Sequence, residues 1–282
     1  MEELIVAGVD IGSTMTKVVI HNQRTMSTFI GPTGAEYRIL AHKVVEDALN
    51  KASLDFNDLA YVVATGYGRM SVPFADQQIT EISCHARGGH SLFPTARTVI
   101  DIGGQDSKAI KLNEQGRVIN FVMNDKCAAG SGRFLEVMAE SLGLKLEELG
   151  ELSLKGETII KISSICTVFA EQEVVGHIAD GRRLEDVLAG LHDSLASRVY
   201  SMAERIRVEP DVVLTGGVAK NIGIRKAMEK KLGYEVLLPP EPLLTGAIGA
   251  ALLAKELALK AIEQGLPLKK ERRPLEAAKF FE

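Results

Sequence analysis

The chain has 282 residues, of which 46% are hydrophobic and 25% charged, and its formal net charge is −4 at pH 7. These values are typical of a globular protein with one large or two modest domains. The negative charge argues against a general nucleic-acid binder, because phosphate binding usually shows as a basic excess. We expect neither a membrane span nor a signal peptide, since no long unbroken apolar run occurs and Met1 precedes two acidic residues. The expected location is the cytoplasm.

Two segments are each predicted to form a pair of β-strands joined by an acidic turn that contains glycine. The first is 4–20, with its turn at 10–14, and the second is 98–112, with its turn at 101–105. Such turns suit nucleotide phosphates, because glycine lets the backbone approach, N–H and hydroxyl groups bind oxygens, and aspartate can hold Mg²⁺ through water. One such turn would be a weak signal, and its repetition strengthens it.

Two further aliphatic segments, 61–68 and 211–218, each contain a predicted strand that ends in Thr-Gly. The chain therefore reads as a duplicated α/β unit, with turn and strand in the same order in each half. Asp10 and Asp101 are 91 residues apart, whereas Val62 and Val212 are 150 apart, so the second half carries about 59 additional residues. We place this insertion at about 121–182.

The rest of the pattern predicts a set of helices and one strand that ends at a proline. The helices are expected at 36–49, 74–88, 184–206, 221–232 and 245–255, and the strand at 234–242. Gly246 and Gly249 share one helix face, which would allow close packing at a hinge. We expect lobes at 1–95 and 96–262, followed by a tail at 263–282 whose basic part is solvated.

The three cysteines do not make a disulfide framework in a reducing compartment. Cys127 and Cys166 each precede a helical pattern, where unpaired N–H groups and the helix dipole favour a thiolate or a bound anion. Metal or redox chemistry is one interpretation of this pair, and buried inert thiols are the other. Cys84 lies inside a predicted helix without a nearby partner in sequence, so we assign it to packing, and we expect its neighbour His85 to make an interdomain contact.

The two turns, the Thr-Gly-Gly segment at 215–217, and Gly246 with Gly249 resemble the actin, sugar kinase and heat-shock ATPase superfamily over 6–259. Three segments, 64–69, 124–134 and 166–171, resemble one branch of it. That branch comprises the activators of 2-hydroxyacyl-CoA dehydratases, such as 2-hydroxyglutaryl-CoA dehydratase, and the related ATPase subunits of benzoyl-CoA reductase. The resemblance implies a duplicated, ribonuclease H-like α/β fold with two lobes and the nucleotide in the cleft.

The resemblance also implies which residues bind ATP or ADP. Asp10 and Asp101 would hold hydrated Mg²⁺, and Glu81 would position the attacking water, with a salt bridge as its alternative role. The phosphate contacts would come from Gly12, Ser13, Thr14 and Lys17 in the first turn and from Gly103, Gly104 and Gln105 in the second. Gly216 and Gly217 would flank the adenosine, with Gly246 nearby. Glu171 and Glu173 are expected to be solvated charges, because residues two apart on a helix face different ways.

For the cysteines, the resemblance implies a homodimer that holds one 4Fe-4S cluster between its subunits through Cys127 and Cys166 of each chain. The number of ligands agrees, since the cluster needs four thiolates and a two-fold axis doubles the two of one chain. A zinc site is a weaker interpretation, because neither cysteine stands in a C-x₂-C or Cys-His pair. A disulfide or redox dithiol would leave both helix-start positions unexplained.

The implied activity is ATP hydrolysis coupled to delivery of a low-potential electron to a separate acyl-CoA dehydratase or reductase in anaerobic metabolism. Ferredoxin or flavodoxin would be the electron donor, and neither nucleic acid nor a membrane would be a partner. Hydrolysis is expected to change the closure of the two halves and to move the cysteine helices. A small-molecule kinase on the same scaffold is the alternative function, and a nucleotide-dependent regulator with inert thiols is a third. Both would leave the cysteine pair unused.

Overall fold

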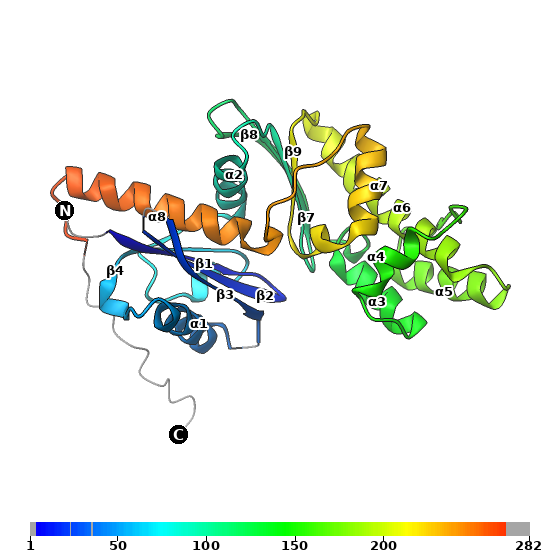
Figure 1. Cartoon of the computed structure of the whole chain (residues 1–282), viewed down its shortest axis with the longest axis horizontal. Coiled ribbons are helices and arrows are strands. Elements are labelled where there is room, and N and C mark those ends of the chain that lie inside the picture. Colours follow the sequence, from blue (N-terminus) through cyan, green and yellow to red (C-terminus); the bar gives the residue numbers. More distant parts are fainter. Residues whose placement is uncertain (1–3, 23, 35, 269–282) are drawn as a thin grey trace, which may run out of the picture. The chain divides into compact units, whose positions relative to one another are not determined.

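The computed structural model describes residues 4–22, 24–34 and 36–268 (Figure 1). Contacts within the chain divide it into two compact units, Met1–Leu92 with Leu243–Glu282, and Phe93–Pro242. The first boundary lies near the expected one, but residues from Leu243 onward group with the first unit, which differs from the expected second lobe at 96–262. The basic part of the expected tail, from Lys269 onward, lies outside the described residues.

A mixed five-stranded sheet with the order β3-β2-β1-β4-β5 forms the first unit. The hairpin pairs β1–β2 and β2–β3 are antiparallel, and β1 pairs with β4 in parallel. The strands are β1 (Ile5–Ile11), β2 (Met15–Asn22), β3 (Arg24–Pro32), β4 (Leu59–Thr65) and β5 (Gln77–Gln78). The helices are α1 (Tyr37–Lys51) and α2 (Glu81–Leu92), with short 3-10 helices at η1 (Phe56–Asp58) and η2 (Arg69–Ser71), and α8 (Thr245–Glu263) after η6 (Pro242–Leu244).

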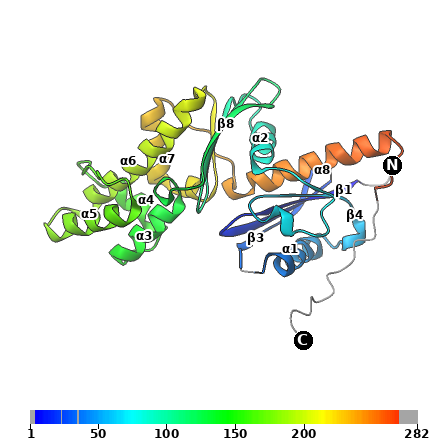
Figure 2. The same cartoon turned by 180° about the vertical axis from the view of Figure 1, so that it is seen from behind.

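Helices α1 and α8 cover opposite faces of this sheet (Figures 1 and 2). Every residue of β1 is buried, and alternate residues belong to different apolar clusters. Ala7 and Val9 belong to the cluster that includes α1, whereas Val6 belongs to the cluster that includes α8. Gly8 allows α8 to approach, since a Cβ there would lie 2.1 Å from the carbonyl oxygen of Ala247.

Helix α8 bears on the expectation that the chain has no membrane span. By length and composition alone, Pro242–Glu263 is the one segment of the described chain that could cross a bilayer. More than half (56%) of its most apolar window is buried inside the structure, against β1, β4 and α2. Such burial is typical of a core helix in a globular domain.

The second unit repeats the plan of the first with a sheet of the order β8-β7-β6-β9. Its hairpin pairs are antiparallel and β6 pairs with β9 in parallel, as β1 does with β4. Helix α6 (Leu184–Ala203) packs on β7 and β8, as α1 packs on β2 and β3. The strands are β6 (Thr98–Ile102), β7 (Ser107–Leu112), β8 (Val118–Asn124) and β9 (Val212–Thr215), followed by η5 (Gly217–Lys220) and α7 (Ile222–Leu232).

The two units differ in what joins the third strand to the following helix. Four residues, 33–36, connect β3 to α1, whereas 125–183 connect β8 to α6. This longer connection contains both Cys127 and Cys166. Its helices are η3 (Ala128–Gly130), α3 (Gly132–Leu142), α4 (Glu148–Ser153) and α5 (Thr167–Ala179), and the short η4 (Glu204–Ile206) follows α6.

Two predicted elements differ from the structure, and two of its strands were missed. The strand expected at 234–242 is wrong, because only Leu237 forms an isolated bridge, with Val213, before the prolines begin. The helix expected from residue 74 begins at Glu81, after the short strand β5. Strands β3 and β8 were not predicted, although each completes the hairpin pattern of its sheet.

Candidate functional site

The first predicted phosphate turn joins β1 to β2 and presents Asp10 beside a lysine. Asp10 and Lys17 are opposite each other in the antiparallel register. The Lys17 amino group lies 2.9 Å from the Asp10 carboxylate, and both side chains are almost fully buried. Lys17, predicted as a phosphate contact, therefore forms an ion pair with the predicted magnesium ligand.

The second turn repeats this pairing between Asp101 and Lys108, which are also opposite each other. The Lys108 amino group lies 3.2 Å from Asp101 and 2.9 Å from Asp106. The Thr215 hydroxyl donates a 2.9 Å hydrogen bond to the other carboxylate oxygen of Asp101. Sequence reasoning missed Lys108, although it follows Asp101 by the same seven residues that separate Lys17 from Asp10.

A glycine after the parallel strand packs on the aspartate in each unit. Gly66 follows β4 with φ +83°, and Gly216 follows β9 with φ +87°. A Cβ on Gly66 would lie 2.4 Å from an Asp10 carboxylate oxygen, and one on Gly216 would lie 2.8 Å from that of Asp101. Both glycines are required by backbone conformation and by space.

The tips of the two turns close in the same way. The Gly12 N–H donates to the carbonyl of Met15 at 3.0 Å, and the Gly103 N–H donates to that of Asp106 at 2.9 Å. The predicted phosphate contacts at each tip lie partly or fully exposed, namely Ser13, Thr14, Gly104 and Gln105. The tips can therefore present hydroxyl groups and backbone to a ligand.

Glu81 forms the ion pair that was its alternative role. Its carboxylate lies 3.2 Å from Arg69, which also donates a 2.9 Å hydrogen bond to the carbonyl of Gly66. Gly246 lies beside the first turn, since a Cβ there would be 2.9 Å from an Asp10 oxygen and 2.8 Å from the His85 ring. Glu81 is thus linked through Arg69 to Gly66, and Gly246 lies directly beside Asp10.

The three cysteines fall into two classes. Cys127 and Cys166 are exposed, whereas Cys84 is fully buried, which confirms its assignment to packing. Burial raises the pKa of the Cys84 thiol to about 12. Within the described ranges, no group of three or more His, Cys, Asp or Glu side chains is placed to hold a metal ion.

Cys127 precedes the 3-10 helix η3, and α3 begins only at Gly132. The Asn124 side chain brackets the cysteine, because its amide oxygen accepts the Cys127 N–H at 3.1 Å and its amide nitrogen donates to the Cys127 carbonyl at 2.8 Å. The helical pattern expected after Cys127 is therefore present, with the short η3 standing between the cysteine and α3. A Cβ on Gly130 would lie 2.6 Å from the Asn124 amide, so this glycine makes room for the bracket.

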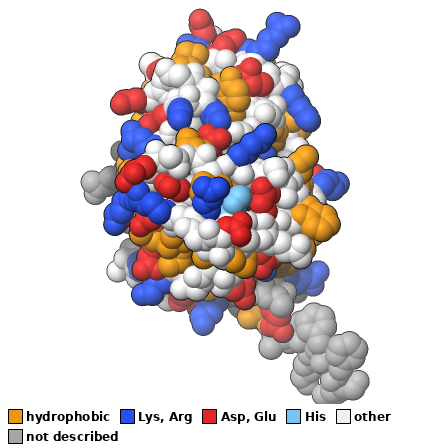
Figure 3. Space-filling model, turned by 90° about the vertical axis from the view of Figure 1, so that its right-hand side faces the viewer, with side chains coloured by type: hydrophobic (Ala, Val, Ile, Leu, Met, Phe, Trp, Pro, Cys, Tyr) orange, Lys and Arg blue, Asp and Glu red, His pale blue; other side chains and the backbone are white. Residues whose placement is uncertain are grey.

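Cys166 is the N-cap residue of α5, as predicted, and its carbonyl accepts the Ala170 N–H at 2.9 Å. Large exposed apolar side chains surround it in sequence: Ile165, Val168 and Phe169 are 76%, 57% and 62% exposed. In the space-filling view of this side of the chain, hydrophobic patches alternate with charged groups (Figure 3). An apolar cluster next to a thiol is suited to a protein contact.

The second phosphate turn is bonded directly to the cysteine-bearing segment. The Gly103 and Gly104 carbonyls accept hydrogen bonds, both of 2.8 Å, from the N–H groups of Gly132 and Arg133. Gly132 permits this approach, since a Cβ there would lie 3.1 Å from the Gly103 oxygen. The start of α3 is therefore joined to the second phosphate turn by two backbone hydrogen bonds.

The prediction that Glu171 and Glu173 are solvated charges is wrong. Glu171 accepts a hydrogen bond from the Ser141 hydroxyl of α3. Glu173 accepts bonds from the N–H groups of Ser163 and Ser164, both at 2.8 Å, and from the Ser163 hydroxyl at 2.9 Å. Partial burial raises the Glu173 pKa, but these bonds outweigh it and lower the pKa to about 2.

Arg198 of α6 is a further residue of this region that sequence reasoning missed. It donates to the carbonyls of Ala129 at 3.0 Å and Ser164 at 2.7 Å, and it lies over the Phe134 ring. No sequence pattern marks it, because its partners are backbone carbonyls in two distant loops. Burial lowers its pKa, and the nearby Cys127 and Glu173 oppose that shift.

Comparisons with known proteins agree with this geometry. The chain is 45% identical over 256 residues to the (R)-2-hydroxyglutaryl-CoA dehydratase activating ATPase of Acidaminococcus fermentans, covering 90% of this chain and 98% of that one. The solved activator of the 2-hydroxyisocaproyl-CoA dehydratase from Clostridium difficile, with bound ADPNP, has a TM-score of 0.87 and 45% identity. That likeness covers 93% of this chain and 98% of the activator.

A more distant likeness concerns the fold alone. A ROK family glucokinase from Streptomyces griseus aligns with a TM-score of 0.54 at 15% identity, covering 89% of this chain and 99% of that chain. The predicted actin-like, sugar-kinase-like α/β fold is therefore confirmed. The model of the BadF/BadG/BcrA/BcrD ATPase family matches residues 7–254. The chain belongs to the BadF/BadG/BcrA/BcrD ATPase family, whose members here include activators of 2-hydroxyacyl-CoA dehydratases.

Proposed function

We propose that this chain is an ATP-hydrolysing, homodimeric iron-sulfur activator. It would deliver a low-potential electron to a 2-hydroxyacyl-CoA dehydratase or a related acyl-CoA reductase in the cytoplasm, with ferredoxin or flavodoxin as its donor. The observation that carries the proposal is the pair of exposed thiols in the 125–183 connection of an ATPase-family chain. A small-molecule kinase would have no use for that pair.

The cysteines suit a 4Fe-4S cluster by their chemistry and their exposure. Such a cluster takes four thiolates and supplies one-electron chemistry at low potential. Cys127 and Cys166 would hold it, while Cys84 is buried. One chain then offers two ligands, and a second copy would complete the set across a two-fold axis.

Each phosphate turn would contribute to nucleotide binding through its own residues. Asp10 and Asp101 would hold Mg²⁺ through water. Lys17 and Lys108, each ion-paired with its aspartate, would place a positive charge beside the phosphate oxygens. The remaining proposed contacts are Gly12, Ser13, Thr14, Gly103, Gly104 and Gln105 for the phosphates, and Gly216, Gly217 and Gly246 for the adenosine side.

Glu81 is the proposed residue that positions the attacking water. Its pairing with Arg69 would hold the carboxylate in one orientation at the start of α2. Hydrolysis would reach the cysteines through the second turn, since the Gly103 and Gly104 carbonyls are bonded to the start of α3. A shift of that turn would displace the segment that follows Cys127.

Anaerobic purification with iron and sulfide analysis tests the proposal. We expect about four irons and four sulfides per two chains in the wild type, and loss of the cluster in Cys127→Ser and Cys166→Ser. Cys84→Ala is the matched control and should retain the wild-type iron content, because its thiol is buried. An iron-free wild-type protein that phosphorylates a metabolite would overturn the proposal in favour of the kinase.

A further inference from the structure

The segment that leads to Cys166 has neither helix nor strand from residue 157 to residue 165, and we call it the strap. Its beginning is held by α6. The Glu157 and Thr158 N–H groups donate to the Asp186 carboxylate at 2.7 and 3.0 Å. The strap then crosses α6 at Gly190, where a Cβ would lie 1.7 Å from the carbonyl oxygen of Ile160.

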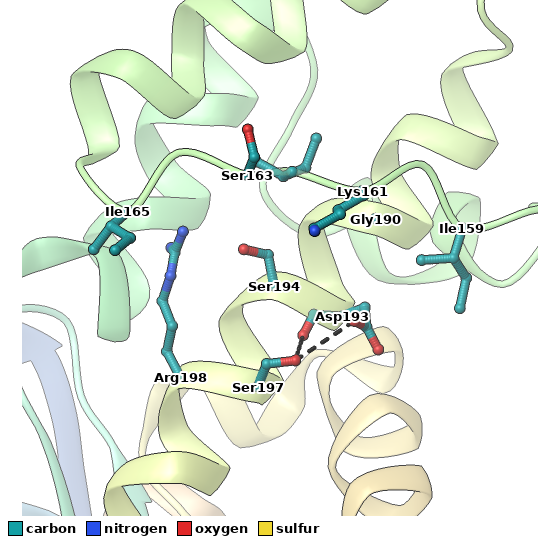
Figure 4. A pocket seen from close by; sticks show the side chains of 10 residues that line it. Ile159, Lys161, Ser163, Ile165, Gly190, Asp193, Ser194, Ser197 and Arg198 are labelled. Atoms are coloured by element: carbon teal, nitrogen blue, oxygen red, sulfur yellow. Dashed lines mark hydrogen bonds between the residues drawn. The ribbon is translucent and has the colours of Figure 1, made fainter.

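The end of the strap lies over a cavity of about 310 Å³. In the close view, Ser163, Lys161 and Ile165 lie on the strap, and Ser194 and Arg198 rise toward it from α6 (Figure 4). Close packing therefore supports these last residues less than it supports a core segment. Their position depends on polar anchors.

Glu173 and Arg198 are those anchors, and they differ in reach. Glu173 accepts the hydrogen bonds of Ser163 and Ser164, so it acts on the strap alone. Arg198 donates one bond to the Ser164 carbonyl, two residues before Cys166, and another to the Ala129 carbonyl, two residues after Cys127. One guanidinium thus joins both cysteine loops.

The chemistry of arginine suits this task. Its planar group presents separate N–H donors in a fixed geometry, whereas lysine offers a single flexible point of charge. Contact with the buried Phe134 ring, 4.7 Å from the guanidinium carbon, holds the side chain against α3. Arg198 is therefore fixed to α6 by its backbone and to α3 by its ring contact, while its donors reach both loops.

We propose that Arg198 is a positioning residue that sets the two cysteine loops relative to each other, while Glu173 holds the Cys166 loop alone. The inference rests on the proposed function, in which both thiols bind one cluster. Fixing the ligands before the cluster loads lowers the ordering cost of binding and raises its kinetic stability. An arginine with only a general structural role would stabilise the whole second unit, and its loss would not act on the two cysteine loops in particular.

Hydrogen–deuterium exchange on the cluster-free full chain tests the selectivity. Arg198→Met should raise exchange about tenfold or more in both peptides 126–133 and 161–167, since each lost bond involves a charged donor. Glu173→Gln should do so in 161–167 only. Lys161→Met, which removes a neighbouring exposed charge from the same cavity, should change neither.

The pattern of exchange decides the outcome. Unchanged exchange in either loop of Arg198→Met would overturn the inference, as would an equal rise in β6 and β9, which would indicate a general loss of stability. Arg198→Lys serves where the methionine variant does not fold. It keeps the charge but not the two separate donors, and it should loosen both loops.

A second measurement follows the cluster itself in anaerobically reconstituted protein. Arg198→Lys should shorten the lifetime of bound iron against a chelator by about tenfold, and Lys161→Met should leave it unchanged. A wild-type lifetime in Arg198→Lys would show that only charge matters and would overturn the inference. A wild type that binds no iron would instead defeat the proposed function, and the exchange experiment would still report whether the two loops are joined.

Discussion

Gly216 shows how one residue controls the environment of Asp101. It combines a φ of +87° with a position where a Cβ would meet both the Ile102 carbonyl at 2.3 Å and the Asp101 carboxylate at 2.8 Å. Gly66 does the same for Asp10. The duplicated glycine therefore serves the placement of the aspartate in each unit, beyond the adenosine contact expected for Gly216.

Gly216→Ala should weaken nucleotide binding by roughly tenfold or more, because displacing Asp101 disturbs charged hydrogen bonds worth about 1.5–3 kcal/mol. Calorimetric titration with ADP and Mg²⁺ measures the effect. Gly233→Ala is the matched control: its φ of +83° imposes the same backbone strain, but no atom lies within 4 Å of the added Cβ. Equal losses of affinity in the two variants would contradict the role given to Gly216.

The cysteines should also differ in reactivity as single residues. In the cluster-free native chain, two thiols should react readily with a disulfide reagent at pH 8, and the third only after unfolding. The Cys84 pKa of about 12, against an ordinary 9.0, lowers its thiolate fraction about a thousandfold, and burial blocks access besides. If three thiols reacted equally fast in the native wild type and only two in Cys84→Ala, Cys84 would be accessible and the assignment would be contradicted.

At the scale of elements, α5 and the strap are joined through an ionised carboxylate. Glu173 has a pKa of about 2, below its ordinary 4.5, so it stabilises the folded state fully above about pH 4.5. That contribution is lost as the pH falls toward 2, because protonation then favours the unfolded chain.

The loss of unfolding free energy caused by Glu173→Gln should follow this pH dependence. Urea unfolding, followed by circular dichroism, should show that the free energy of unfolding of the variant lies below that of the wild type by an amount that is constant above about pH 4.5 and shrinks toward pH 2. Glu140→Gln, on the exposed face of α3, is the control and should cost little at any pH. A difference for Glu173→Gln that stays the same at low pH would contradict the assignment.

Helices α2 and α8 pack through glycines. A Cβ on Gly249 would lie 1.8 Å from the Cys84 carbonyl oxygen, and one on Gly88 would lie 2.0 Å from that of Thr245. The close approach predicted from the shared face of Gly246 and Gly249 is therefore present. It explains why α8, the last described helix, belongs to the first unit.

Gly249→Ala should lower the free energy of unfolding by about 1–3 kcal/mol or more, because the obstructing atoms are backbone and cannot rotate away. Gly176→Ala offers a control within a helix, since nothing lies within 4 Å of its added Cβ. That substitution should instead stabilise by about 0.5–1 kcal/mol through helix propensity. Thermal unfolding of both variants gives the comparison, and a neutral Gly249→Ala would show that the helices can separate without cost.

At the scale of the whole molecule, the proposed cluster would link two chains through thiolates from each. Removing the iron should therefore raise the dimer dissociation constant by about tenfold or more. Sedimentation velocity under anaerobic conditions, before and after treatment with an iron chelator, measures the change. The Cys127→Ser/Cys166→Ser double variant should already dissociate more readily and should not respond to the chelator. A wild-type dimer unaffected by iron loss would show that the protein interface alone holds it.

Much of the fold could be predicted because its signals are local. The turns at Asp10 and Asp101 and the Thr-Gly strand ends are short motifs, and their repetition predicted two units of the same plan. Of the strand expected at 234–242, only Leu237 pairs, and the prolines that follow it have no N–H to donate to a further bridge. The membership of α8 was misjudged because its glycine contacts are with α2, far away in sequence.

The sequence by itself determined the duplicated α/β plan, the acidic turns, the insertion in the second half and the distinction of Cys127 and Cys166 from Cys84. These follow from residue types and spacings that act over a few residues or repeat along the chain. Only the tertiary structure decided that Lys17 and Lys108 neutralise the two aspartates, that Glu81 pairs with Arg69, and that Arg198 joins the two cysteine loops. The physical reason is that such bonds need a donor and an acceptor that packing brings together. The local sequence pattern does not indicate which distant residues will meet.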